Sequence, residues 1–157
     1  MSTFAAGCIL LQKEMKDISA YAEEINEYNK TLSDHLFIKF GENAVTYSTW
    51  LSSIWENGLQ FELTDSIEDN SADNSFSLFC FKPSCFQLII SHYLYQLFAF
   101  VFDTKKAIAI RFAIMEDVEP VTMNQFRDVH ISNFEEVFLN ISNNIISKEN
   151  TYLTIIP

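Results

Sequence analysis

Twenty consecutive residues without a charged side chain, Pro83 to Phe102, constrain this chain more than any other feature. A run of this length can span a bilayer as a helix, or it can supply the core of a globular domain. Polar residues are spread through it, among them Gln87, Ser91, His92 and Gln96. A second apolar run at 107–115 would have no explanation in a membrane protein. We therefore expect 83–102 to be a buried core segment and the protein to have no membrane contact. Hydrophobic periodicity leaves 86–96 open between a helix and a buried strand.

Length and composition favour one folded domain in a reducing compartment. A chain of 157 residues fits a single domain spanning 1–157. Apolar residues make up 48% of it, including fifteen phenylalanines, and this excludes intrinsic disorder. The three cysteines, Cys8, Cys80 and Cys85, are an odd number in a chain large enough to fold without disulfides. We therefore expect free thiols and a cytoplasmic location.

The N-terminal part is predicted to be a helix within 1–31, followed by an α+β body over 35–157. Apolar residues recur at helical spacing, so we expect a helix over 4–31 that begins at Ala5-Ala6-Gly7-Cys8. Alternating patterns predict strands at 36–40 and 59–63. Helical spacing predicts a helix over 47–55 that stops at Asn57-Gly58, and 76–81 is predicted to be a strand.

The C-terminal part is predicted to start with a hairpin over 98–114. Three phenylalanines alternate at 98–102, Asp103 to Lys106 supplies a turn, and four apolar residues alternate at 108–114. A helix is predicted at 133–146, with Glu135 and Glu136 in its first turn, and the tail at 152–156 is predicted to add an edge strand. The predicted fold is therefore a single α+β domain. It has a mainly antiparallel sheet, with an N-terminal helix and C-terminal helices packed on it.

No motif for catalysis, cofactor binding or metal binding is present. The three histidines are isolated in sequence, and we expect His92 to be a hydrogen-bonded core residue. The three glycines are too dispersed for a phosphate-binding loop or a dinucleotide fingerprint, and no GxSxG elbow exists. Cys80 and Cys85 have no second ligand pair for zinc. We therefore expect no enzymatic activity, no cofactor and no metal.

The distribution of charge is the best candidate signal of function. The chain holds 21 acidic and 10 basic residues, a formal net charge of −11, which argues against nucleic-acid binding and favours a basic protein partner. Seven acidic residues and no basic residue lie between Phe40 and Phe81, and three more lie between Phe112 and Phe126. We expect the following residues to contact the partner: Glu62, Asp65, Glu68, Asp69, Asp73, Glu116, Asp117 and Glu119. The alternative is that these acids only keep a phenylalanine-rich protein soluble.

Two stretches of the sequence resemble a known family. They are Tyr47-x-x-Trp50-Leu51-x-x-x-Trp55-Glu56-Asn57-Gly58-Leu59 and Phe98-x-Phe100-x-Phe102-Asp103-x-Lys105-x-Ala107-Ile108-x-Ile110. Together with the acidic turn Met115-Glu116-Asp117, these resemble immunity proteins of bacterial contact-dependent growth inhibition systems. The resemblance covers about residues 45–140 of the chain. It implies a small cytoplasmic α+β protein that binds the C-terminal toxin domain of its own system. It assigns no individual binding residue.

Two functions from different classes follow from these observations. The first is an immunity protein that neutralises a cognate toxin domain, expected to be a nuclease, through an acidic surface. The second is a homodimeric acidic chaperone for a secreted bacterial effector. Such chaperones have the order helix, three strands, helix, two strands, helix, which the predicted elements fit loosely. A decoy that mimics DNA would need evenly spaced carboxylates, and the clustered acids of this chain do not provide them.

Overall fold

The computed structural model describes residues 4–12, 17–32, 36–40, 58–65, 85–115, 123–143 and 151–157. The strands are β1 (Phe4–Leu11), β2 (Leu36–Phe40), β3 (Gly58–Asp65), β4 (Ala107–Met115), β5 (Arg127–His130) and β6 (Thr151–Ile156). The α-helices are α1 (Ile18–Leu32), α3 (Cys85–Asp103) and α4 (Phe134–Asn143). Two short 3-10 helices, Met123–Gln125 and Ile131–Asn133, flank β5.

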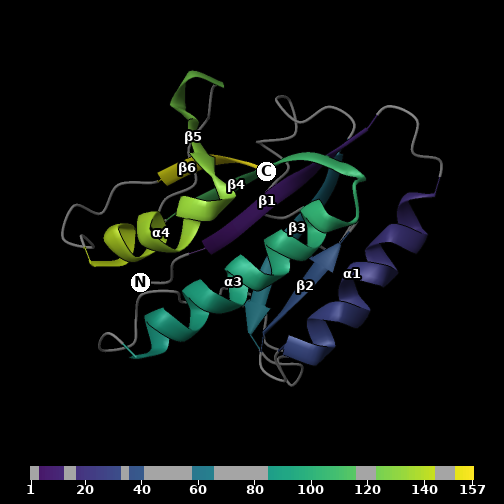
Figure 1. Ribbon diagram of the computed structural model, residues 1–157, viewed down its shortest axis with the longest axis horizontal. Helices are drawn as coiled ribbons and strands as arrows, with labels where there is room; N and C mark the ends of the chain where they lie inside the picture. Colours follow the sequence, from purple (N-terminus) through teal and green to yellow (C-terminus); the bar gives the residue numbers. More distant parts are fainter. Residues whose placement is uncertain are drawn as a thin grey trace.

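The six strands form one sheet in the order β2-β3-β1-β4-β6-β5. Every neighbouring pair is antiparallel except β5 and β6, which are parallel. Helix α3 crosses the sheet between α1 and α4 and contacts both of them (Figure 1). The predicted α+β class with a single sheet is therefore confirmed, and the antiparallel arrangement is confirmed in part, because β5 and β6 are parallel.

The first segment is a strand, so the prediction of a helix over 4–31 is wrong for its first part. Gly7 lies in close contact with both neighbouring strands, because a Cβ atom at this position would lie 2.3 Å from the carbonyl oxygen of Arg111 and 2.6 Å from the Phe61 ring. Only glycine allows β1 to approach both neighbours so closely. Helix α1 begins at Ile18, where the backbone N–H of Ala20 donates to the Asp17 carboxylate at 3.0 Å and so caps the helix.

Helix α3 replaces the first strand of the hairpin predicted over 98–114, and it shows that 86–96 are helical. Phe98, Val101 and Phe102 lie at helical spacing and are all buried in the core. Phe100 points to a different neighbour, since its ring stacks on Tyr28 of α1 with centroids 4.0 Å apart. The alternation of phenylalanines therefore reflects burial on two sides of a helix. None of the helices in the described part of the chain is long and apolar enough to cross a membrane.

The predicted strand at 108–114 is confirmed as β4, with one irregularity. The register against β1 shifts between Leu10 and Leu11, so that Leu11 pairs with Ala107 while Leu10 pairs with Ala109. Ile108 is the extra residue of this bulge, and 53% of it is exposed, whereas Ala107 joins the core. The alternation predicted over 108–114 is therefore interrupted at Ile108, which the bulge exposes.

Other predictions have mixed outcomes. The strands at 36–40 and 59–63 are confirmed as β2 and β3. The helix predicted at 133–146 is confirmed as α4 over Phe134–Asn143, with Glu135 and Glu136 in its first turn, while 144–146 lie outside the described residues. The tail forms β6, but β6 is an inner strand and β5 takes the edge. The helix predicted at 47–55 and the strand at 76–81 lie outside the described residues.

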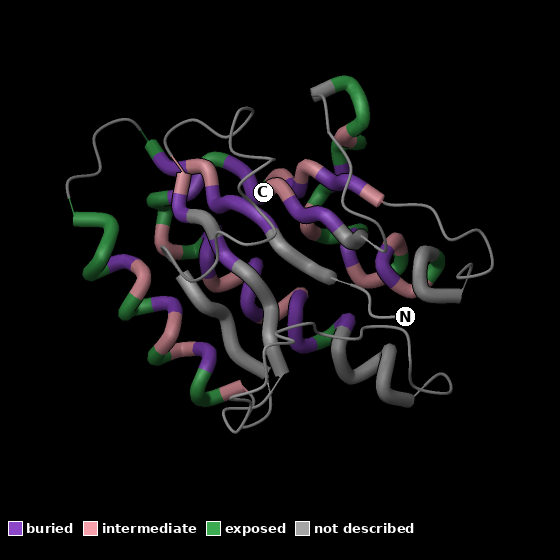
Figure 2. The backbone as a smooth tube through the Cα atoms, turned by 180° about the vertical axis from the view of Figure 1, so that it is seen from behind, coloured by how far each residue is buried: buried purple, intermediate pink, exposed green. Residues whose placement is uncertain are grey.

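The core between sheet and helices is rich in aromatic rings. Phe98 of α3 makes edge-to-face contacts with Phe112 of β4 and with Phe134 of α4, at centroid distances of 5.5 and 5.4 Å. Burial of each such side chain contributes about 1.5–3 kcal/mol. Figure 2 shows buried positions along the central strands and exposed ones along the outer side of α1. The sheet and its helices therefore share one aromatic core.

Candidate functional site

The structure places two of the eight expected partner-binding residues. Glu62 and Asp65 lie on β3, Asp65 being its last residue. The other six lie outside the described residues: Glu68, Asp69, Asp73, Glu116, Asp117 and Glu119. The structure also shows where β3 and β4, the strands that precede these acidic segments, end in the sheet.

Strands β3 and β4 flank β1, and both are antiparallel to it, so the two run in the same direction. Their register agrees, because Ala6 of β1 pairs with Glu62 on one side and with Ala113 on the other. β3 then ends at Asp65 and β4 at Met115, at the same end of the sheet. We call this end, defined by Asp65 and Met115, the exit end. Two strand spacings separate the strands there, a distance of about 10 Å.

A second set of acidic side chains lies on α1. Glu23, Glu24 and Glu27 are exposed on this helix. The Glu27 carboxylate lies 2.9 Å from the Lys30 amine. The Glu24 carboxylate lies 3.0 Å from the amine of Lys106, the residue that precedes β4. Exposed pairs of this kind contribute little to stability. These acids are therefore partly neutralised by cations of the chain itself.

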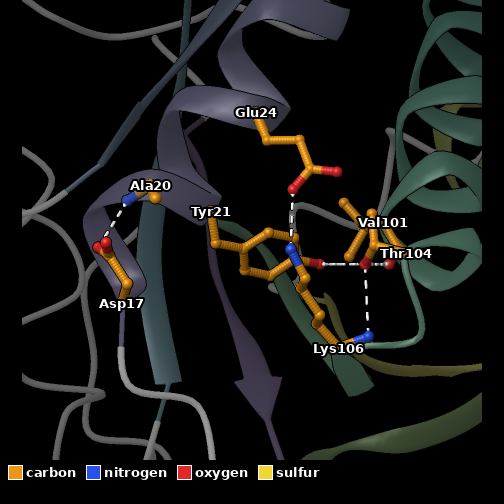
Figure 3. Close-up of polar contacts among 7 residues, drawn as sticks. All are labelled: Asp17, Ala20, Tyr21, Glu24, Val101, Thr104 and Lys106. Carbon is orange, nitrogen blue, oxygen red and sulfur yellow. Dashed lines mark hydrogen bonds and ion pairs between the residues drawn. The ribbon is translucent and has the colours of Figure 1, made fainter.

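Helix α1 is fixed to the turn between α3 and β4 by a small polar cluster (Figure 3). The Tyr21 hydroxyl lies 2.9 Å from the Thr104 hydroxyl and 3.2 Å from the carbonyl oxygen of Val101. The Lys106 amine lies 5.2 Å from the centre of the Tyr21 ring. Burial raises the pKa of Tyr21, and the hydrogen bond with Thr104 opposes that shift. The arrangement positions helix α1 against this turn.

A buried polar pair joins α1 to α3. The Tyr93 hydroxyl donates to the side-chain oxygen of Asn29, and both residues are buried. Burial raises the pKa of Tyr93. Sequence analysis missed this pair, although a signal was present: Tyr21, Ile25 and Asn29 recur every four residues, so Asn29 lies on the buried face of the helix. A polar residue on such a face needs a partner.

His92 and His130 are both exposed, whereas we expected His92 to be a core residue. His92 is exposed on α3, and its Nδ1 atom lies 2.9 Å from a carboxylate oxygen of Glu135 on α4. His130 precedes the 3-10 helix, and its Nδ1 atom accepts a hydrogen bond from the backbone N–H of Ser132 at 3.3 Å. The prediction of a buried His92 is therefore wrong, because α3 turns this position away from the sheet.

Cys8 and Arg111 are cross-strand neighbours on β1 and β4. Burial raises the pKa of the Cys8 thiol to about 12, and the charge of Arg111 opposes the shift. Burial also lowers the pKa of Arg111, whose guanidinium lies 5.9 Å from the centre of the Phe126 ring. A thiol acts as a nucleophile only as the thiolate. Cys8 is therefore a packing residue at neutral pH.

The chain was compared with known proteins in three ways. No protein-family model, no curated protein and no solved structure matches it. Within the described ranges, no three histidine, cysteine or carboxylate residues are grouped closely enough to hold a metal ion. The expectations that the chain binds no metal and catalyses no reaction stay predictions. Function is therefore argued from the charge and topology of the chain itself.

Proposed function

We propose that the protein is a cytoplasmic immunity protein that binds and neutralises a cognate bacterial toxin domain through an acidic surface. The single observation that supports this best is the exit end of the sheet. Strands β3 and β4 both end there, and each leads directly into a segment that is rich in acidic residues and free of lysine and arginine. The two acidic segments therefore begin at strand ends that lie about 10 Å apart.

The chemistry of the partner follows from this charge. A nuclease holds a polyanionic substrate, so its active-site cleft is basic. Acidic segments of an inhibitor can occupy that cleft in place of nucleic acid and pair with its lysines and arginines. The formal net charge of −11 would also accelerate the encounter with such a partner. We therefore propose a nuclease as the toxin.

A homodimeric chaperone for a secreted effector is the second candidate. It shares the acidic charge, and the order α1, β2, β3, α3, β4, β5, α4 follows the expected order in part. Two strands differ from that order: β1 precedes α1 and is an inner strand of the sheet, and β6 follows α4. The expected chaperone order has neither strand, so the immunity function is preferred. Light scattering separates the two, since the chaperone requires a homodimer.

Co-expression tests the immunity function directly. The chain is expressed in a bacterium together with the C-terminal domain of a large secreted protein encoded beside its gene. We expect cells with both proteins to grow, and cells with the toxin domain and an empty vector to die. A toxin domain with an inactivated active site serves as the control for expression load. Survival no better than with the empty vector would overturn the proposal.

A further inference from the structure

We draw no further inference here: the strongest candidate, the apolar surface patch at Ile108 in the bulge of β4, carries nothing because no described residue shows what covers it.

Discussion

The hydroxyl group of Tyr93 on α3 donates a hydrogen bond to the side-chain oxygen of Asn29 on α1, and both residues are buried. Tyr93→Phe removes this donor, so the Asn29 side-chain oxygen loses this hydrogen bond. We expect the free energy of unfolding to fall by about 0.5–1.5 kcal/mol, the net contribution of one such hydrogen bond. Urea denaturation measures this loss. Tyr95→Phe, on the same helix and only partly buried, is the matched control and should change stability by less.

The raised pKa values of Tyr21 and Tyr93 predict a loss of stability at alkaline pH. The folded state favours the neutral phenol, so this contribution is fully present below the ordinary pKa of 10.0 and decreases as the pH rises above it. We expect the urea midpoint to fall above that pH. The double variant Tyr21→Phe/Tyr93→Phe should show a shallower fall, because the buried phenols are gone. Equal slopes for the two proteins would contradict the assignment.

Both wrong secondary-structure predictions concern apolar segments that are covered on more than one side. In β1, Ile9 and Leu11 are buried in the helix-facing core, and Cys8, which precedes Ile9, is buried as well. In α3, Phe98 faces the sheet and Phe100 faces Tyr28. Periodicity is most informative when one face is polar, and Asp103 at the end of α3 is the only charged residue in these two segments.

The segments with one polar face were predicted correctly. α4 has Phe134 and Phe138 in the core and exposed Glu136 on the other side, so its period is visible in the sequence.

Only the charge of the candidate site could be predicted from the sequence. Counting charged residues along the sequence is enough to find the two acidic segments. That both segments start at the same end of the sheet depends on the position of β1 between β3 and β4. That long-range pairing has no local signal in the sequence.

Gly58 provides a test of the packing between β1 and β3. A Cβ atom at this position would lie 1.9 Å from the Cys8 sulfur and 3.2 Å from the carbonyl oxygen of Ile9. We expect Gly58→Ala to lower the free energy of unfolding by about 1–3 kcal/mol through overpacking. Cys8→Ala removes the sulfur, so the double variant should lose less than the sum of the two single variants. Strict additivity would show that the two residues are not in contact.

The buried thiol of Cys8 should be unreactive toward thiol reagents in the folded protein. Its pKa of about 12 keeps it protonated at pH 8, and no part of the residue is exposed. In a Cys80→Ser/Cys85→Ser background, we expect a thiol reagent to react with Cys8 only as fast as the protein unfolds. The same protein in concentrated urea is the positive control. Rapid reaction under native conditions, with unchanged circular dichroism, would show that β1 is not the buried central strand.

The acidic segment after β3 should control how fast the protein associates with the proposed toxin domain. Glu68→Gln/Asp69→Asn removes two charges beyond Asp65, whereas Glu23→Gln/Glu27→Gln removes two exposed charges from α1. Charge mainly sets the association rate, so we expect the first variant to slow association about tenfold at low salt, with a smaller effect for the second. Surface plasmon resonance with an inactivated toxin domain measures both rates. Equal slowing by the two variants would mean that net charge alone attracts the partner, and the exit end would then have no special role in binding.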